Sequence, residues 1–185
     1  MSAMIELEKL GKTIVFVTHD IDEAVKLGDR VAVFRVGGKL AQYDEPGVLL
    51  ARPADDFVDS FVGRDRGYRG LSFRSSERLP LHDVRTAHSG ERTEQGWSLV
   101  LDADGRPLGW HHDRADGGTA DVNDLVPGGS LYDAGTGSLR SALDAALSSP
   151  SGQGVAVDGD GRVVGAVVAD DVVEALAAAR RAEAA

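Results

Sequence analysis

Two stretches of the chain repeat one short pattern, and this internal repeat constrains the fold more than any other feature. Residues 98–109 read SLVLDADGRPLG and residues 154–165 read GVAVDGDGRVVG, an offset of 56 residues. Each copy has an apolar run, a D-x-D-G-R turn and a second apolar run, which predicts a β-hairpin. A unit of this size cannot bury an apolar face alone, so we expect the two copies to pack together.

The second copy has predicted helices on both sides. Residues 139–147 (LRSALDAAL) are amphipathic, and residues 170–181 place several apolar side chains on one helical face. The first copy is followed instead by HHDRADGGTADV, which is too short and too rich in glycine for a full helix. We therefore expect an α+β fold over residues 80–185, with a degenerate first half.

The first third of the chain has the pattern of alternating helices and strands. Residues 13–17 (TIVFV) form a continuous, β-branched apolar run, which is typical of a parallel strand buried on both faces. The fold class predicted for residues 1–63 is therefore α/β. Residues 64–79, rich in Arg and weakly periodic, are predicted to be a linker. The other expected elements are helices at 2–10, 22–27, 46–51 and 55–62 and a hairpin of strands at 31–36 and 39–43.

Charge and composition exclude several classes of function. The net charge is −10, and residues 71–185 hold 10 Lys and Arg against 18 Asp and Glu. Such an acidic surface repels phosphate backbones, so nucleic acid is not an expected partner. No apolar run approaches the roughly 18 residues that span a bilayer, and the chain has no Cys for disulfides or thiolate sites. We expect a cytoplasmic protein.

The stretch from residue 11 to residue 63 carries the most specific motifs. It contains GKTIVFVTHDIDEAVKLGDRVAVF and then GGKLAQYDEPGVLLARPADDFVDSFVG, which resembles the end of an ABC-type nucleotide-binding domain. By this resemblance, Thr18, His19 and Asp20 match the H-loop, and His19 contacts the γ-phosphate of ATP. A histidine at the carboxyl end of a buried strand lies where α/β sheets bind ligands, and its ring can donate to a phosphate oxygen. Taken from its spacing alone, His19 could instead be a histidine that caps a loop.

Three phrases, HDIDEAVKLGDR, GGKLAQYDEPG and PADDFVDSFVG, are most similar to subunits that import glycine betaine, choline, proline and related osmoprotectants. In that subfamily a CBS domain pair commonly follows the cassette, and the repeat over residues 80–185 resembles a degenerate tandem CBS pair. The resemblance implies ATP and Mg²⁺ in the intact subunit. It also implies transmembrane permease subunits and a second ATPase subunit as partners, a homodimer, and a location at the inner face of the cell membrane.

The sequence departs from the ABC family in the parts that carry catalysis. The P-loop G-x-x-x-x-G-K-[ST], the Q-loop, the LSGGQ-type signature and the acidic pair that binds Mg²⁺ are not among these residues. We therefore expect no ATP hydrolysis from this chain alone, and we expect residues 1–63 to be poorly stable unless another chain pairs with them. The main interpretation is a fragment of an importer's ATP-binding subunit. The alternative is a stand-alone, non-catalytic CBS module that binds an adenine nucleotide and carries a vestigial cassette remnant.

The CBS resemblance also implies one nucleotide contact. In that family, G-h-h-T-x-x-D supplies an adenine-nucleotide site in which the Thr meets phosphate and the Asp meets ribose. The second copy, GAVVADD, has Val168 at the Thr position and keeps Asp171, whereas the first has His112 and Ala115. A ribose contact at Asp171 is the prediction. The alternative is that Asp170 and Asp171 only cap and charge the start of a helix.

No metal site is predicted. His111 and His112 are adjacent on a strand and therefore point to opposite faces. The D-x-D-G-R turns at Asp102 and Asp158 resemble the start of a Ca²⁺ loop, but the glutamate required at position 12 is missing. We interpret both as hairpin turns.

Overall fold

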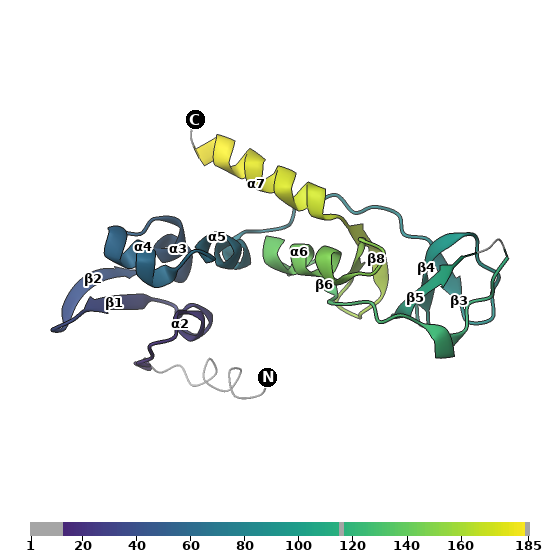
Figure 1. Cartoon of the computed structure of the whole chain (residues 1–185), viewed down its shortest axis with the longest axis horizontal. Coiled ribbons are helices and arrows are strands. Elements are labelled where there is room, and N and C mark those ends of the chain that lie inside the picture. The colour runs from purple at the N-terminus through teal and green to yellow at the C-terminus, as the bar shows by residue number, and fades with distance from the viewer. Residues whose placement is uncertain (1–12, 115–116, 184–185) are drawn as a thin grey trace. The chain divides into compact units, whose positions relative to one another are not determined.

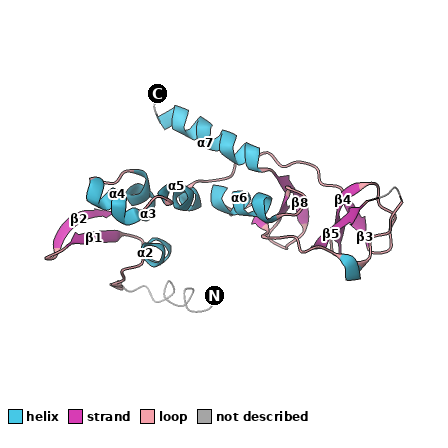
Figure 2. Cartoon of the chain, in the orientation of Figure 1, coloured by secondary structure: helices cyan, strands magenta, loops and turns pink. Residues whose placement is uncertain are grey.

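The computed structural model describes residues 13–114 and 117–183 of the 185-residue chain (Figure 1). Two compact units make up the chain, Met1–Gly70 and Leu71–Ala185, and each is described by itself. Both mix helices with small sheets (Figure 2), so the predicted combination of α/β and α+β structure is confirmed. The helix predicted at residues 2–10 lies outside the described residues. None of the helices in the described ranges is long and apolar enough to cross a membrane.

The first unit packs short helices against one hairpin. Gly37 and Gly38 have φ angles of 82° and 72°, a conformation that only glycine adopts readily, and they form the hairpin turn. The seven residues of its core are apolar: Val25, Val31, Val33, Leu49, Leu50, Val58 and Val62. The elements are α2 (Ile21–Leu27), β1 (Val31–Arg35), β2 (Lys39–Asp44), α3 (Pro46–Ala51), α4 (Asp56–Val62) and α5 (Arg66–Gly70).

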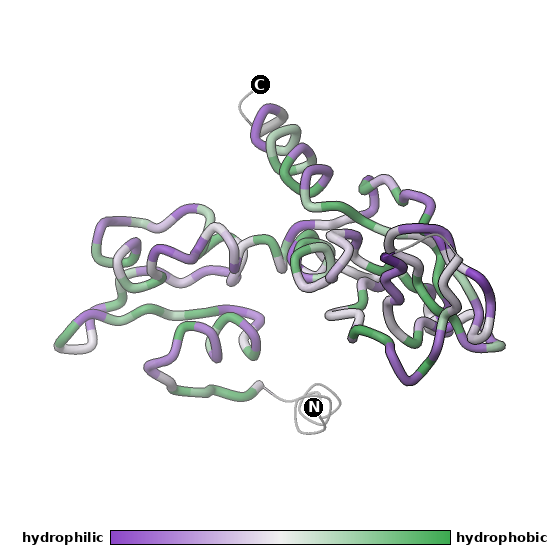
Figure 3. The backbone as a smooth tube through the Cα atoms, turned by 45° about the vertical axis from the view of Figure 1, so that its right-hand side comes forward, coloured by the Kyte–Doolittle hydropathy of each residue, from purple (hydrophilic) through white to green (hydrophobic). Residues whose placement is uncertain are grey.

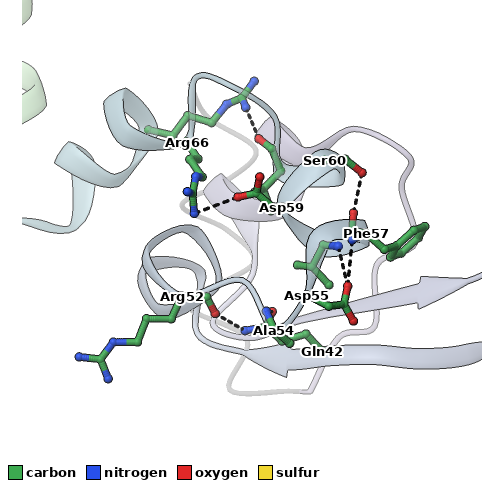
Figure 4. A network of polar contacts seen from close by, with 11 residues as sticks. Gln42, Arg52, Ala54, Asp55, Phe57, Asp59, Ser60 and Arg66 are labelled. Atoms are coloured by element: carbon green, nitrogen blue, oxygen red, sulfur yellow. Dashed lines mark hydrogen bonds and ion pairs between the residues drawn. The ribbon is translucent and has the colours of Figure 1, made fainter.

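Polar contacts fix the chain between β2 and α4 (Figure 4). The buried Gln42 donates from Nε2 to the carbonyl oxygen of Arg52 (3.1 Å) and accepts from the Ala54 amide (2.8 Å). Asp55 caps α4 by accepting from the amides of Phe57 and Val58. The Val58 amide, more than the nearby Arg35, lowers the pKa of Asp55 below its usual value. These contacts connect the segment that follows α3 to β2 and cap the start of α4.

The strand predicted at residues 13–17 is not formed. These residues have no regular secondary structure, and Val15 and Val17 are 86% and 88% exposed. Figure 3 shows the stretch as a hydrophobic segment beside the grey N-terminal trace. The prediction was wrong because a parallel strand needs hydrogen-bonding neighbours, and the described residues of this unit form only the two-stranded sheet β1-β2.

The second unit contains the repeat as two sheets of identical pattern. In each sheet the first strand pairs parallel with the second, and the second pairs antiparallel with the third. The predicted hairpins are therefore confirmed. The first sheet is β3 (Thr86–His88), β4 (Gly96–Leu101) and β5 (Pro107–Asp113), and the second is β6 (Tyr132–Asp133), β7 (Gly154–Val157) and β8 (Val163–Val167).

Helices distinguish the two copies of the repeat. The second copy has the order β-α-β-β-α, with α6 (Leu139–Ser148) between β6 and β7 and α7 (Ala169–Glu183) after β8. Around the first sheet the described residues form only the short 3₁₀ helix η2 (Val122–Asp124), as the glycine-rich sequence predicts. Leu99 and Trp110 of the first copy share one buried cluster with Val155 and Val157 of the second. The two copies therefore pack together as expected.

Two short helices lie in the range predicted to be a linker. They are α5 and the 3₁₀ helix η1 (Leu71–Phe73), and the boundary between the two units falls between them. Leu71 and Leu79 are buried in the cluster that contains Tyr132, Leu139 and Val172. The second unit therefore begins with the residues that follow α5.

Candidate functional site

The segment predicted to be the H-loop, residues 18–20, makes side-chain contacts at the start of α2. Asp20 is the N-cap residue, and its Oδ1 accepts from the amides of Asp22 (2.7 Å) and Glu23 (3.3 Å). Thr18 donates from Oγ1 to Glu23 Oε2 (2.7 Å) and accepts from the Asp20 amide (3.0 Å). Helix starts prefer an aspartate at the N-cap because its side chain accepts from amides that have no partner within the helix. Thr18 and Asp20, two of the three residues in the predicted H-loop, thus have a local structural role.

His19 lies between Thr18 and the N-cap residue Asp20 with its side chain exposed, in a bend that precedes α2. No hydrogen bond or ion pair joins it to the described part of the chain. Its imidazole is free to donate to an external acceptor such as a phosphate oxygen. The hydrogen bonds of Thr18 and Asp20 position the backbone on either side of His19.

A bidentate ion pair attaches α2 to the end of the first unit. Arg69 Nε and Nη2 donate to Asp22 Oδ1 (2.7 Å) and Oδ2 (3.1 Å), and its Nη1 donates to the carbonyl oxygen of Val62 (2.7 Å). The hydrogen bond from Asp22 raises the pKa of Arg69 above its usual value. The arginine keeps its charge in any case, so the contact positions the helix that follows His19.

The second candidate site lies at the start of α7, where Asp171 occupies the third helical position. Its Oδ2 lies 2.5 Å from Nε2 of His82, with the two side chains 20% and 44% exposed. His82 also forms a β-bridge with Ala166 through two backbone hydrogen bonds of 2.8 and 2.9 Å. Asp171, predicted as a ribose contact, is therefore engaged by a histidine from elsewhere in the chain.

Gly165, the glycine of the predicted G-h-h-T-x-x-D motif, lies on β8 where the segment that contains Leu81 and His82 packs against this strand. A Cβ atom at this position would lie 3.0 Å from the carbonyl oxygen of His82 and 3.1 Å from Leu81 Cβ. Gly109, its equivalent in the first copy, has the same relation to Leu125 and Val126, at 3.0 Å from each. The glycines of the motif are thus required by the segment that crosses each hairpin.

None of the motifs identified in the sequence points to His82. It lies 89 residues from Asp171, outside every motif, and only the β-bridge to β8 brings the two together. Its structural equivalent in the first copy is Val126, which forms the corresponding bridge to Trp110.

The other candidates of the sequence do not form a site. His111 pairs across the sheet with Ser98 and His112 with Trp97, on opposite faces, and the His112 and Trp97 rings lie 4.5 Å apart. The described residues include no cluster of three His, Asp or Glu side chains that could hold a metal ion. Asp102 and Asp158 each accept two backbone amides within their own turns. These aspartates therefore shape hairpin turns, as predicted.

An open pocket of about 380 Å³ lies between residues 72–77 and residues 134–138 of the second unit. Its hydroxyls are largely engaged within the protein: Ser76 donates to the carbonyl oxygen of Gly137 (2.5 Å) and accepts from Tyr132 (2.8 Å). Ser138 caps α6 in a capping box with Ser141. None of the predicted site residues lines this pocket.

Comparison with known proteins supports the ABC resemblance. The chain is 35% identical over 187 residues to the osmoprotectant import ATP-binding protein OsmV of Salmonella typhimurium. The alignment covers 93% of this chain and 48% of that protein. It is 51% identical over 59 residues to the carnitine transport ATP-binding protein OpuCA of Listeria monocytogenes, covering 32% of this chain and 15% of that protein. The chain therefore spans about half the length of the Salmonella relative and less of the Listeria one.

Similar solved structures include the CBS-pair protein CBSX2 of Arabidopsis thaliana, at 12% identity and a TM-score of 0.43 over 58% of this chain and 97% of that one. The cytosolic domain of the Mg²⁺ channel MgtE in complex with ATP has 18% identity and a TM-score of 0.43 over 69% of this chain and 62% of that one. No family model matches the chain. From the sequence relatives we conclude that the chain is homologous to the ATP-binding subunits of osmoprotectant ABC importers, as its motifs predict.

Proposed function

We propose that the chain acts as the C-terminal part of the ATP-binding subunit of an importer for osmoprotectants of the quaternary-amine type. The observation that carries this proposal is the 35% identity to an osmoprotectant import subunit over 93% of the chain. In the intact subunit, ATP hydrolysis drives uptake of a small solute such as glycine betaine, choline or carnitine. The partners are permease subunits and a second ATP-binding subunit, and the site of action is the inner face of the cell membrane.

His19 is the group that this chain supplies to ATP chemistry. Its exposed ring, on the residue between Thr18 and the N-cap Asp20, can donate a hydrogen bond to the γ-phosphate. The phosphate cradle and the ligands for Mg²⁺ come from other parts of the subunit, because none of those motifs is present here. His19 therefore senses the nucleotide, and the rest of the subunit performs the hydrolysis.

The acidic second unit regulates the transporter in this proposal. Its internal repeat and the β-α-β-β-α order of its second copy support a CBS-type pair, in which Asp171 contacts the ribose of an adenine nucleotide. Its 10 Lys and Arg against 18 Asp and Glu make it responsive to ionic strength as well. Salt activation of uptake that stays the same after deletion of residues 71–185 would contradict the ionic-strength part.

The experiment that tests the proposal replaces His19 in the native gene. Cells that carry His19→Ala are assayed for uptake of radiolabelled glycine betaine, choline and carnitine at high osmolarity, with His88→Ala as a matched control for an exposed histidine. We expect loss of uptake for His19→Ala and unchanged uptake for the control. Unchanged uptake of all three solutes in the His19 variant would overturn the proposal and favour a non-catalytic regulatory module. Mass spectrometry of the endogenous polypeptide then shows whether these residues occur within a longer subunit.

A further inference from the structure

The contact between His82 and Asp171 is an addition to a backbone arrangement that both copies of the repeat share. In the second copy His82 is bridged to Ala166 of β8, and in the first copy Val126 is bridged to Trp110 of β5. The backbone bonds agree closely, at 2.8 and 2.9 Å in one copy and 2.8 and 2.8 Å in the other. Trp110 and Ala166 are separated by the 56-residue offset of the repeat. His82 and Val126 are therefore structural equivalents.

Only the second copy has polar side chains both at the bridging position and at the position of Asp171. Val126 has no polar group, and the sequence position equivalent to Asp171 is Ala115, which lies outside the described residues. The first copy nevertheless forms the same backbone bridge. The contact of His82 with Asp171 is therefore not required for the segment to form its bridge to the hairpin, which argues against a purely structural role.

We propose that His82 blocks Asp171 until a ligand displaces it. The inference rests on the proposed function, in which Asp171 is the ribose contact. A carboxylate binds a vicinal diol through its oxygens as acceptors, and one of these oxygens, Oδ2, lies 2.5 Å from the histidine ring. A nucleoside or nucleotide must therefore compete with an internal partner for Asp171.

The geometry lets the ring leave without breaking the fold. The backbone of His82 is held by its two hydrogen bonds to Ala166, whereas its side chain is 44% exposed. Rotation about the side-chain torsions moves the ring into solvent and leaves the bridge in place. The blocked and open forms thus differ by one rotamer, and the cost of opening is the loss of one partly exposed hydrogen-bonded contact.

Nucleotide titration of the full chain tests this inference, with AMP, ADP and ATP each measured by calorimetry. His82→Val introduces the residue that the first copy has at the equivalent bridge, so we expect this variant to fold. It should bind nucleotide about fivefold more tightly, since one partly exposed hydrogen bond contributes little. His88→Val, at an exposed histidine on β3, is the matched control and leaves the affinity unchanged. Asp171→Asn weakens binding in both backgrounds.

The outcomes separate the inference from the function on which it rests. Equal affinity of wild type and His82→Val, with loss of binding in Asp171→Asn, would overturn the blocking role and leave the nucleotide site in place. Absence of binding to wild type and to His82→Val would overturn the inference together with the nucleotide site, whereas the uptake assay of His19 variants would still decide the transport function. If circular dichroism shows that His82→Val is unfolded, NMR of the wild-type His82 ring decides: AMP must shift its signal and leave that of His88 unchanged.

Discussion

Arg106 and Arg162 hold equivalent places in the two copies of the repeat, and each forms a hydrogen bond to the turn of the other copy. Arg106 Nε donates to the carbonyl oxygen of Asp160 (3.1 Å), and Arg162 Nε donates to the carbonyl oxygen of Asp104 (3.2 Å). The amide of Val163 adds a bond to the carbonyl oxygen of Gly105 (3.0 Å). The arginine of the D-x-D-G-R pattern therefore joins the two hairpins, which explains why both copies contain it.

Replacement of either arginine with alanine should destabilise the second unit. We expect Arg106→Ala and Arg162→Ala each to lower the free energy of unfolding by about 1 kcal/mol, the usual net value of one hydrogen bond. Both tryptophans of the chain lie in this unit, on β4 and β5, so urea unfolding followed by tryptophan fluorescence reports on it. Arg78→Ala, at an exposed arginine, is the control. An effect no larger than that of the control would contradict the joining role.

Gly165, which packs against the backbone of His82, should not tolerate a side chain. Gly165 has a φ of 153°, and a Cβ atom there would lie 3.0 Å from the carbonyl oxygen of His82. We expect Gly165→Ala to lower the free energy of unfolding by about 2 kcal/mol through this close contact and the strained backbone. Gly159→Ala is the matched control, because nothing lies within 4 Å of its added Cβ. Equal stability of the two variants would show that the crossing segment moves aside.

Local patterns in the sequence predicted most of the elements, because their causes are local. Asp20 and Asp55 cap helices through amides two and three residues away, and the glycine pair at residues 37–38 forms its turn without distant partners. The repeat predicted both hairpins of the second unit. The run at residues 13–17 failed as a strand because its formation depends on neighbouring strands rather than on its own composition.

The candidate sites were predictable only in part. His19 and Asp171 were found from motifs, and the structure describes where each lies. His82 could not be found from any motif, since its meeting with Asp171 depends on how a segment before one hairpin crosses the other copy. Long-range pairing of this kind follows from the packing of the two copies. The repeat predicts that the copies pack together, but it does not predict which residues meet.

Arg69 should stabilise α2, the helix that follows His19. Loss of its bidentate contact with Asp22 and of its bond to the carbonyl oxygen of Val62 frees α2 from the end of the first unit. We expect Arg69→Ala to increase hydrogen exchange of the α2 amides about fivefold, which corresponds to about 1 kcal/mol. Arg64→Ala, an exposed arginine nearby, serves as control. Unchanged exchange in α2 would mean that the helix is held by its caps and core alone.

Asp133 should make the second unit sensitive to acid. The amides of Thr136 and Gly135, which donate to Oδ1 at 2.9 and 2.8 Å, lower the pKa of this carboxyl below its usual value. Since the folded pKa lies below the unfolded value of about 3.9, the ionised group stabilises the fold above that value, and the effect is lost as pH falls through the folded pKa. Asp133→Asn keeps an acceptor oxygen but does not titrate.

Comparing the stability of wild type and Asp133→Asn tests the direction of this pH dependence. The wild type should exceed Asp133→Asn in free energy of unfolding at neutral pH, and the difference should shrink as the pH falls below about 4. Urea unfolding at a series of pH values measures it. A difference that is the same at all pH values would show that the titration of Asp133 contributes nothing.

The exposed apolar run should make the isolated chain prone to self-association. Val15 and Val17 expose most of their surface next to Ile14 and Phe16, which are 51% and 58% exposed, and contiguous apolar segments that could add to a sheet edge favour aggregation. We expect the double substitution of Val15 and Val17 with serine to lower the aggregated fraction in sedimentation velocity severalfold, without a change in the circular dichroism spectrum. Val36→Ser is the control, because Val36 is fully exposed but stands alone at a turn. An aggregated fraction that is the same in both variants and in wild type would show that residues 13–17 do not need a partner. A cooperative melt of the isolated first unit would contradict the same expectation, since this unit was predicted to need strands from elsewhere.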